Sequence, residues 1–80
     1  MKANIYVTLK REVLDPQGDA VRHSLRSLGF EEVKSARVGK LIELELQGDD
    51  RESAESHIQS MCEKLLANPV IEDFRYEIVD

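Results

Sequence analysis

The middle of the chain reads EVKSARVGKLIELEL (Glu32–Leu46), and this stretch decides the fold. In its second half, Ile42, Leu44 and Leu46 alternate with two glutamates, and this period of two predicts a half-buried strand. Its first half, residues 33–38, is strand-like but weaker. Gly39-Lys40 between the halves allows two arrangements, a tight type II′ hairpin or one long bent strand. In either arrangement we expect this stretch to form the centre of a sheet.

Two further strands are predicted near the ends of the chain. Ala3–Leu9 alternates apolar and polar residues and is rich in strand-favouring side chains. Val70–Val79 places Phe74, Tyr76 and Ile78 on one face and charged residues on the other. Each of these strands therefore has one apolar face that must be covered.

Two helices are predicted between the strands. Asp15 is a suitable N-cap, Pro16 suits the first helical position, and Gly29 is a typical helix stop, so the first helix is expected over Pro16–Leu28. A second helix begins after Gly48-Asp49-Asp50 and ends at Asn68-Pro69. Its apolar stripe comprises Ala54, Ile58, Met61, Cys62, Leu65 and Leu66.

These elements predict an α+β fold, a two-layer sandwich with both helices on one face of an antiparallel sheet. With the central stretch counted as two strands, the order is the ferredoxin-like β-α-β-β-α-β arrangement, formed by a single domain over residues 1–80. An open sheet face and a small core favour dimerisation, and a long central strand would have an overhang able to pair across a dimer. The open face is expected to carry Tyr6, Thr8, Arg37, Glu43, Glu45, Arg75 and Glu77.

Charge and composition argue against several classes of partner. Sixteen acidic residues against eleven basic ones give a formal net charge of -5, which opposes binding to nucleic acid or to an anionic membrane surface. No apolar run approaches the ~18 residues of a membrane span. A single cysteine excludes an intrachain disulfide and suits a reducing compartment. A cytoplasmic protein is expected.

The sequence offers no clear catalytic or metal-binding constellation. Cys62 lies in the apolar stripe and is interpreted as a core thiol, and His23 and His57 as solvated helix residues. There is no pair of cysteines or histidines at metal-ligand spacing. Val38-Gly39-Lys40 lacks the frame of a phosphate-binding loop. We therefore expect no catalytic residue, no bound cofactor and no metal in this chain.

Several segments, in order along the whole domain, resemble PurS, the small subunit of bacterial and archaeal phosphoribosylformylglycinamidine synthase. LDPQG and CEKLLANPVIED together carry the most specific part of the resemblance. One departure is Arg11-Glu12, where the family often has Pro-Gly, and it affects only a loop. The matching segments are Val13–Gly18, Ser27–Phe30, Val38–Lys40, Ile42–Leu44 and Cys62–Asp73.

The resemblance implies a role in the fourth step of de novo purine synthesis, as a subunit of an ATP-dependent ligase that takes its amide nitrogen from glutamine. In this family a large synthetase subunit uses ATP and Mg²⁺, and a glutaminase subunit releases ammonia. The small subunit, as a homodimer or a tetramer, joins the two and supports ammonia transfer. It is not expected to contain an active site of its own.

Exposure and charge suggest where the partners would bind. We expect the interface at Arg37, Gly39 and Lys40, with Tyr6 and Arg75 on the open sheet face. The alternative function is an ACT-like regulatory domain that holds a small metabolite, and this alternative predicts ligand binding by the isolated chain.

Overall fold

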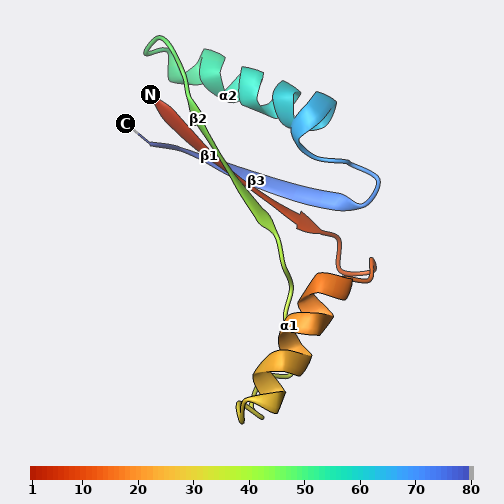
Figure 1. Ribbon diagram of the computed structural model, residues 1–80. Coiled ribbons are helices and arrows are strands. Elements are labelled where there is room, and N and C mark those ends of the chain that lie inside the picture. Colours follow the sequence, from red (N-terminus) through yellow and green to blue (C-terminus); the bar gives the residue numbers. More distant parts are fainter. Residues whose placement is uncertain (80) are drawn as a thin grey trace.

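The computed structural model describes residues 1–79 as a three-stranded sheet with two helices (Figure 1). The sheet order is β2-β1-β3, and both pairs of neighbours are antiparallel. The α+β class and the antiparallel sheet are confirmed, and the strand order is ferredoxin-like with one strand fewer. The elements are β1 (Lys2–Leu9), α1 (Pro16–Ser27), β2 (Lys40–Glu45), α2 (Arg51–Met61), the π-helical turn η1 (Cys62–Leu66) and β3 (Glu72–Val79).

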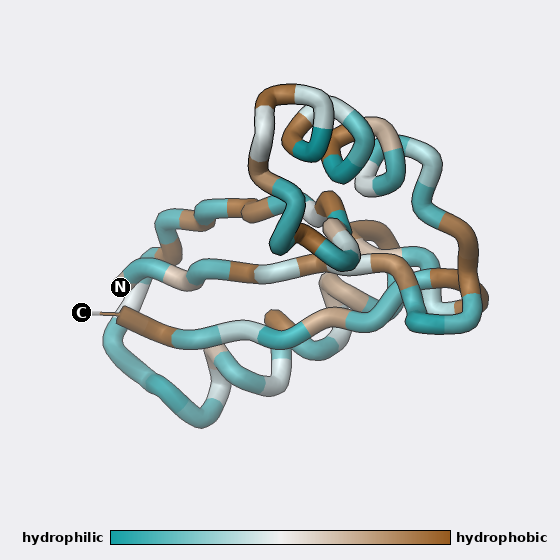
Figure 2. Tube along the Cα trace, turned by 90° about the horizontal axis from the view of Figure 1, so that it is seen from below, coloured by the Kyte–Doolittle hydropathy of each residue, from teal (hydrophilic) through white to brown (hydrophobic). Residues whose placement is uncertain are grey.

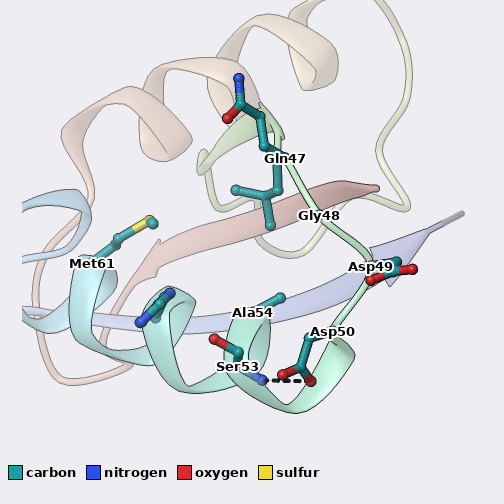
Figure 3. A pocket seen from close by; sticks show the side chains of 9 residues that line it. Gln47, Gly48, Asp49, Asp50, Ser53, Ala54 and Met61 are labelled. Carbon is teal, nitrogen blue, oxygen red and sulfur yellow. Dashed lines mark hydrogen bonds between the residues drawn. The ribbon is translucent and has the colours of Figure 1, made fainter.

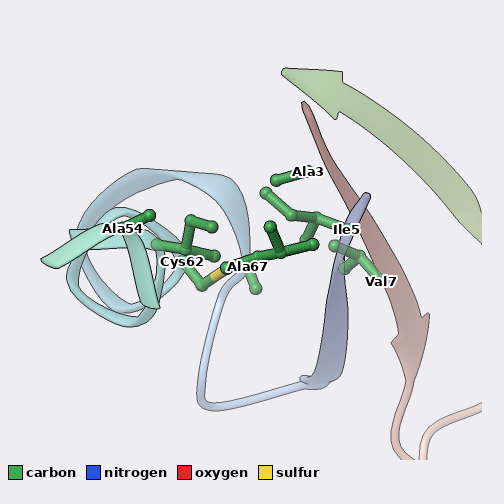
Figure 4. Packing of buried hydrophobic residues seen from close by; sticks show 8 residues of the cluster. Ala3, Ile5, Val7, Ala54, Cys62 and Ala67 are labelled. Carbon is green, nitrogen blue, oxygen red and sulfur yellow. The ribbon is translucent and has the colours of Figure 1, made fainter. Parts of the chain in front are cut away.

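The strand register creates one apolar face. Ile5 of β1 stands between Ile42 of β2 and Tyr76 of β3, and Ala3 stands between Leu44 and Ile78. Val7 stands opposite Phe74 on β3, but its neighbour on β2 is Lys40. α2 and η1 cover this face, where Ile58 and Cys62 are fully buried (Figure 4). The buried hydrophobic residues are Ala3, Ile5, Val7, Ala54, Ile58, Cys62, Ala67 and Ile78.

The central stretch is one long extended segment, not a hairpin. Only Lys40–Glu45 belongs to the sheet, and residues 33–39 run straight from the α1 region into β2 (Figure 1). Gly39 is not among the glycines with positive φ, which a type II′ turn would require at that position. Of the two arrangements that the sequence allowed, the long strand is therefore the one observed.

The expectation that both helices cover the apolar face is wrong for α1. This helix projects beyond the end of the sheet, and Gly18 is its only buried residue (Figure 1). Apolar residues occur on both helices (Figure 2), yet Leu28 at the end of α1 is 74% exposed. The reason is the missing hairpin: because residues 33–39 do not turn back along β2, they carry α1 away from the sheet.

The helix ends follow the sequence signals closely. Asp15 caps α1 by accepting a hydrogen bond from the Gly18 amide at 2.9 Å. Gly29 has a φ of 102°, and the Phe30 amide donates to the Leu25 carbonyl at 3.0 Å, as in a Schellman motif. The helical region of α2 ends as expected before Asn68-Pro69, but through the π-helical turn.

The π-helical turn changes which side chains face the core. The Ala67 amide donates to the Cys62 carbonyl at 3.0 Å, five residues back. This wider turn rotates Leu65 out of the apolar stripe in which the sequence placed it, and Leu65 is 83% exposed.

The described part of the chain is elongated. Its radius of gyration is 16.0 Å and its extents are 48 × 27 × 14 Å. A compact chain of this length would have a radius of gyration of about 12 Å. The difference reflects the projecting α1. No helix within residues 1–79 is long and apolar enough to cross a bilayer.

Candidate functional site

The side chains of this chain that could carry chemistry, Cys62, His23 and His57, lie apart from one another. Cys62 is fully buried, and burial raises the pKa of its thiol. His23 lies on the exposed surface of α1, with its Nε2 atom 3.6 Å from a carboxylate oxygen of Asp19. His57 is exposed on α2. Within residues 1–79, no cluster of three His, Cys, Asp or Glu side chains could hold a metal ion.

The outward face of the sheet carries a cluster of polar side chains that contact one another. The Tyr6 hydroxyl donates to Glu77 Oε1 at 2.8 Å, and Asn4 Nδ2 donates to the same oxygen at 3.3 Å. The Arg75 guanidinium lies 4.0 Å from the centroid of the Tyr6 ring, in cation–π geometry. The hydrogen bond to Glu77 raises the pKa of Tyr6, and the hydrogen bonds from Tyr6 and Asn4 lower the pKa of Glu77. These side chains are held in place before any partner binds.

The part of the outward face that lies on β2 is acidic. Asn4 stands opposite Glu43 on β2 and Glu77 on β3, and Lys2 stands opposite Glu45. Glu43 and Glu45 are exposed. Of the residues expected on this face, all but Arg37 belong to the three strands and share it.

A second structured region connects the sheet to α1. We call it the neck, residues 10–15 and 36–39. Asp15, only 8% exposed, accepts from the Gly18 amide at 2.9 Å and from the Val38 amide at 2.7 Å. These two hydrogen bonds hold the pKa of Asp15 below its ordinary value. A Cβ atom on Gly18 would lie 2.2 Å from the Ala36 carbonyl oxygen, so the first turn of α1 packs directly on the other side of the neck.

The Arg37 side chain joins the two segments of the neck through hydrogen bonds. Its guanidinium donates to the carbonyl oxygens of Leu9 at 3.3 Å, Lys10 at 2.7 Å and Val13 at 3.1 Å. The expected position of Arg37 on the open sheet face is therefore wrong. Residues 33–39 lie outside the sheet, which the chain joins only at Lys40, so the Arg37 side chain meets the turn after β1 instead of an adjacent strand.

The five residues expected at a partner interface thus form two groups. Tyr6 and Arg75 lie together on the outward sheet face, and Arg37, Gly39 and Lys40 follow one another where the neck enters the sheet. Gly39 passes close to β1, because a Cβ atom there would lie 2.7 Å from the Val7 carbonyl oxygen. Lys40, opposite Val7, is exposed.

Sequence reasoning missed two features. It assigned Asp15 only to the first turn of its own helix, because the Val38 amide, which also donates to Asp15, is 23 residues away in the chain. It also missed a groove of 340 Å³ between α2 and the segment that leads into it (Figure 3). The groove has an apolar part and an acidic rim, formed among others by Leu46, Asp49, Asp50, Ala54, His57 and Met61.

Comparison with protein families gives a match along nearly the whole chain. The family described as "PurS: Phosphoribosylformylglycinamidine (FGAM) synthase" matches residues 2–80. The PurS subunit of Bacillus subtilis is 52% identical over 77 residues, which are 96% of this chain and 90% of that protein. The PurS subunit of Archaeoglobus fulgidus is 47% identical over 79 residues, which are 99% of this chain and 96% of that protein.

Solved structures agree with this result. The B. subtilis PurS structure has a TM-score of 0.86 at 51% identity and covers 99% of this chain and 98% of its own. A chain in the structure of PurLQS from Thermotoga maritima has a TM-score of 0.88 at 35% identity, and the match covers 98% of this chain and 95% of that one.

Proposed function

Since this chain belongs to the PurS family of phosphoribosylformylglycinamidine synthase, we propose that it joins the synthetase and glutaminase subunits of that enzyme and supports ammonia transfer between them. It is a subunit of an ATP-dependent ligase and is not itself catalytic. The observation that carries the proposal is the match over 98% of this chain to a chain of the PurLQS structure. The alternative of an ACT-like metabolite-binding domain receives no support from these relatives.

In the proposed mechanism, the chain acts as a scaffold that positions its two partner enzymes. Ammonia released at one active site must reach the other before it escapes to solvent or is protonated, and a scaffold that fixes the two enzymes raises its effective concentration. A glutaminase nucleophile has to be an accessible thiolate, whereas Cys62 is buried and its pKa is raised. We therefore assign glutamine hydrolysis to the glutaminase partner and the use of ATP and Mg²⁺ to the large subunit.

We extend the proposal to the domain organisation, the oligomeric state and the cellular location of the chain. We propose that residues 1–80 act as one PurS-like domain, that the chain self-associates as a homodimer or a dimer of dimers, and that it works in the cytoplasm with its partners. Self-association is supported by the exposed apolar residues in α1 and directly beside it, and by the elongated shape of the described chain.

Reconstitution of the three subunits tests the function. Omitting this chain is expected to lower glutamine-dependent product formation at least about tenfold, because ammonia would no longer be delivered at high local concentration. Synthesis driven by added ammonium salt should remain, since the large subunit needs no delivery in that assay. Equal glutamine-dependent rates with and without the chain would overturn the proposal.

We propose that partner subunits contact Tyr6, Arg75 and Lys40, while Arg37 and Gly39 shape the strand entry that presents Lys40. Lys40→Glu is expected to weaken assembly of the complex about tenfold, because reversing a charge at an interface rim removes a favourable pair and adds a repulsive one. Analytical ultracentrifugation of the mixed subunits measures the change.

Lys64→Glu is the matched control for Lys40→Glu. Lys64 is also exposed but lies on η1, outside the proposed interface. Circular dichroism of both variants should show unchanged helix content. The interface assignment fails if the two variants assemble equally well.

A further inference from the structure

The basic residues of this acidic chain are unevenly distributed. Residues 10–15 and 33–40 contain only two acidic residues, Glu12 and Asp15, and the Asp15 carboxylate is buried and accepts from two backbone amides. Charges more than about 10 Å apart are largely screened by salt, so an anion that approaches this region responds to the local charge and not to the net charge of the chain. Five of the eleven basic residues lie in these two segments: Lys10, Arg11, Lys34, Arg37 and Lys40.

A hollow in this region brings two of the arginines together. It has a volume of about 330 Å³ and is lined by Arg11, Ser35 and Arg37. Arg11 belongs to the turn after β1, whereas Ser35 and Arg37 belong to the extended segment that leads into β2. All three residues are exposed, so a ligand can reach the hollow from solvent and would touch both chain segments at once. The volume is that of a small-molecule site at the lower end of the usual range, about 300–1,000 Å³.

The Arg37 guanidinium is held in a fixed orientation and keeps its charge. Nη2 donates to the carbonyl oxygens of Leu9 and Lys10, and Nη1 donates to that of Val13. These three acceptors are neutral, so they position the guanidinium without neutralising it. Within residues 1–79 the Nε donor makes no hydrogen bond, and an arginine has five N–H donors in all. Arg37 can therefore bind an anion while it still joins the two segments of the neck.

Arg11, on the other side of the hollow, forms no ion pair within the described residues. The ion pairs there are Lys10 with Asp73, Arg22 and His23 with Asp19, and Arg51 with Glu55. The guanidinium of Arg11 therefore remains available to a ligand. Substituting this side chain would also remove no internal hydrogen bond that holds the neck.

We propose that this hollow binds a phosphate group, either as the free ion or as part of a small phosphate monoester. A phosphate carries a charge of about −1.5 to −2 at neutral pH and has three strong acceptor oxygens, which suit two guanidinium groups and the Ser35 hydroxyl. A carboxylate carries one negative charge, which a single arginine can pair in bidentate geometry. The bound phosphate adds a bridge between the turn after β1 and residues 35–37, so it also stabilises the attachment of α1. This proposal does not depend on the assignment to the synthase or on the oligomeric state.

A titration of the ¹⁵N-labelled chain with sodium phosphate, followed by NMR at constant ionic strength, tests the proposal. We expect saturable shifts of the amide signals of Arg11, Ser35 and Arg37, with a dissociation constant of about 1 mM. Arg11→Gln is expected to weaken binding about tenfold, because it removes a charge-assisted hydrogen bond and one of the two positive charges. Circular dichroism of this variant should match that of the parent chain.

Lys34→Gln is the matched control, because Lys34 precedes Ser35 and is exposed but does not line the hollow. It makes the same change of charge and should alter the dissociation constant by less than about twofold. Equal weakening by Arg11→Gln and Lys34→Gln would overturn the site, since it would show attraction to positive charge in general. Shifts of equal size with sodium acetate would overturn it as well.

A parallel titration with glycerol 3-phosphate distinguishes the two sources of the phosphate group. Tighter binding of glycerol 3-phosphate identifies a phosphate monoester as the ligand, and tighter binding of inorganic phosphate identifies the free ion. Either order supports the site, whereas the absence of saturable shifts with both compounds would refute it.

Discussion

Replacing Ile58 by alanine is expected to lower the free energy of unfolding by about 2–5 kcal/mol, the usual cost of such a truncation in a packed core. Ile58 is fully buried and stands at the contact between α2 and the apolar face of the sheet. It belongs to the hydrophobic cluster that joins α2 to the sheet, so the cavity would remove much of the packing that attaches α2. Urea denaturation followed by circular dichroism measures the loss, since the chain has no tryptophan.

Leu65→Ala is the control for this prediction. The sequence places Leu65 in the same apolar stripe as Ile58, but the structure leaves it 83% exposed. Its truncation should change the free energy of unfolding by no more than about 0.5 kcal/mol. Both variants are compared at one protein concentration, because dimer stability depends on concentration. Equal losses for the two variants would contradict the observed position of the π-helical turn.

Asp15→Ala is expected to lower the melting temperature by roughly 10 °C, because it removes a helix cap and leaves a second amide without its acceptor. The two amides are those of Gly18 in α1 and Val38 in the neck. Asp15→Asn keeps the shape and one acceptor oxygen, so it should lose less. Calorimetry of both variants checks the order, and a larger loss for Asp15→Asn than for Asp15→Ala would contradict this account.

The same carboxylate gives the stability a defined dependence on pH. Hydrogen bonds from the Gly18 and Val38 amides lower the folded-state pKa of Asp15 below its ordinary value of 3.8. Its ionised form therefore contributes stability above the ordinary pKa, and this contribution is lost as the pH falls through the folded-state pKa. The difference in melting temperature between the parent and Asp15→Asn should shrink below about pH 4. Parallel curves down to pH 2 would refute the assignment.

Features that depend on neighbouring residues could be predicted from the sequence. The cap at Asp15, the helix stop at Gly29 and the alternation in β1 and β3 each require only local residues, and the structure confirms them. The apolar face of the sheet followed directly from this alternation. The long central strand was one of two arrangements because Gly39 is compatible with both.

Features that depend on distant residues could not be predicted. Val21, Leu25 and Leu28 recur at helical spacing in and directly after α1, which indicates a helix face that must be covered. A periodic pattern does not say whether the helix's own sheet or another molecule covers that face. Arg37 has the same strand parity as residues of the outward face, yet carbonyl groups 24 to 28 residues earlier bind it. Leu65 follows helical spacing, and the π-helical turn that rotates it outward has no sequence signature as clear as a cap.

The small hydrophobic core of this chain has a consequence for how the amount of the protein is controlled in a cell. Three of the buried hydrophobic residues are alanines. An unassembled copy therefore has little packing energy to oppose local unfolding. Transiently opened chains are cleaved by proteases in proportion to how often they open. We expect copies without a partner to have short half-lives and assembled copies to persist. Turnover would then match the number of these subunits to the number of enzyme complexes, without any sensor of stoichiometry.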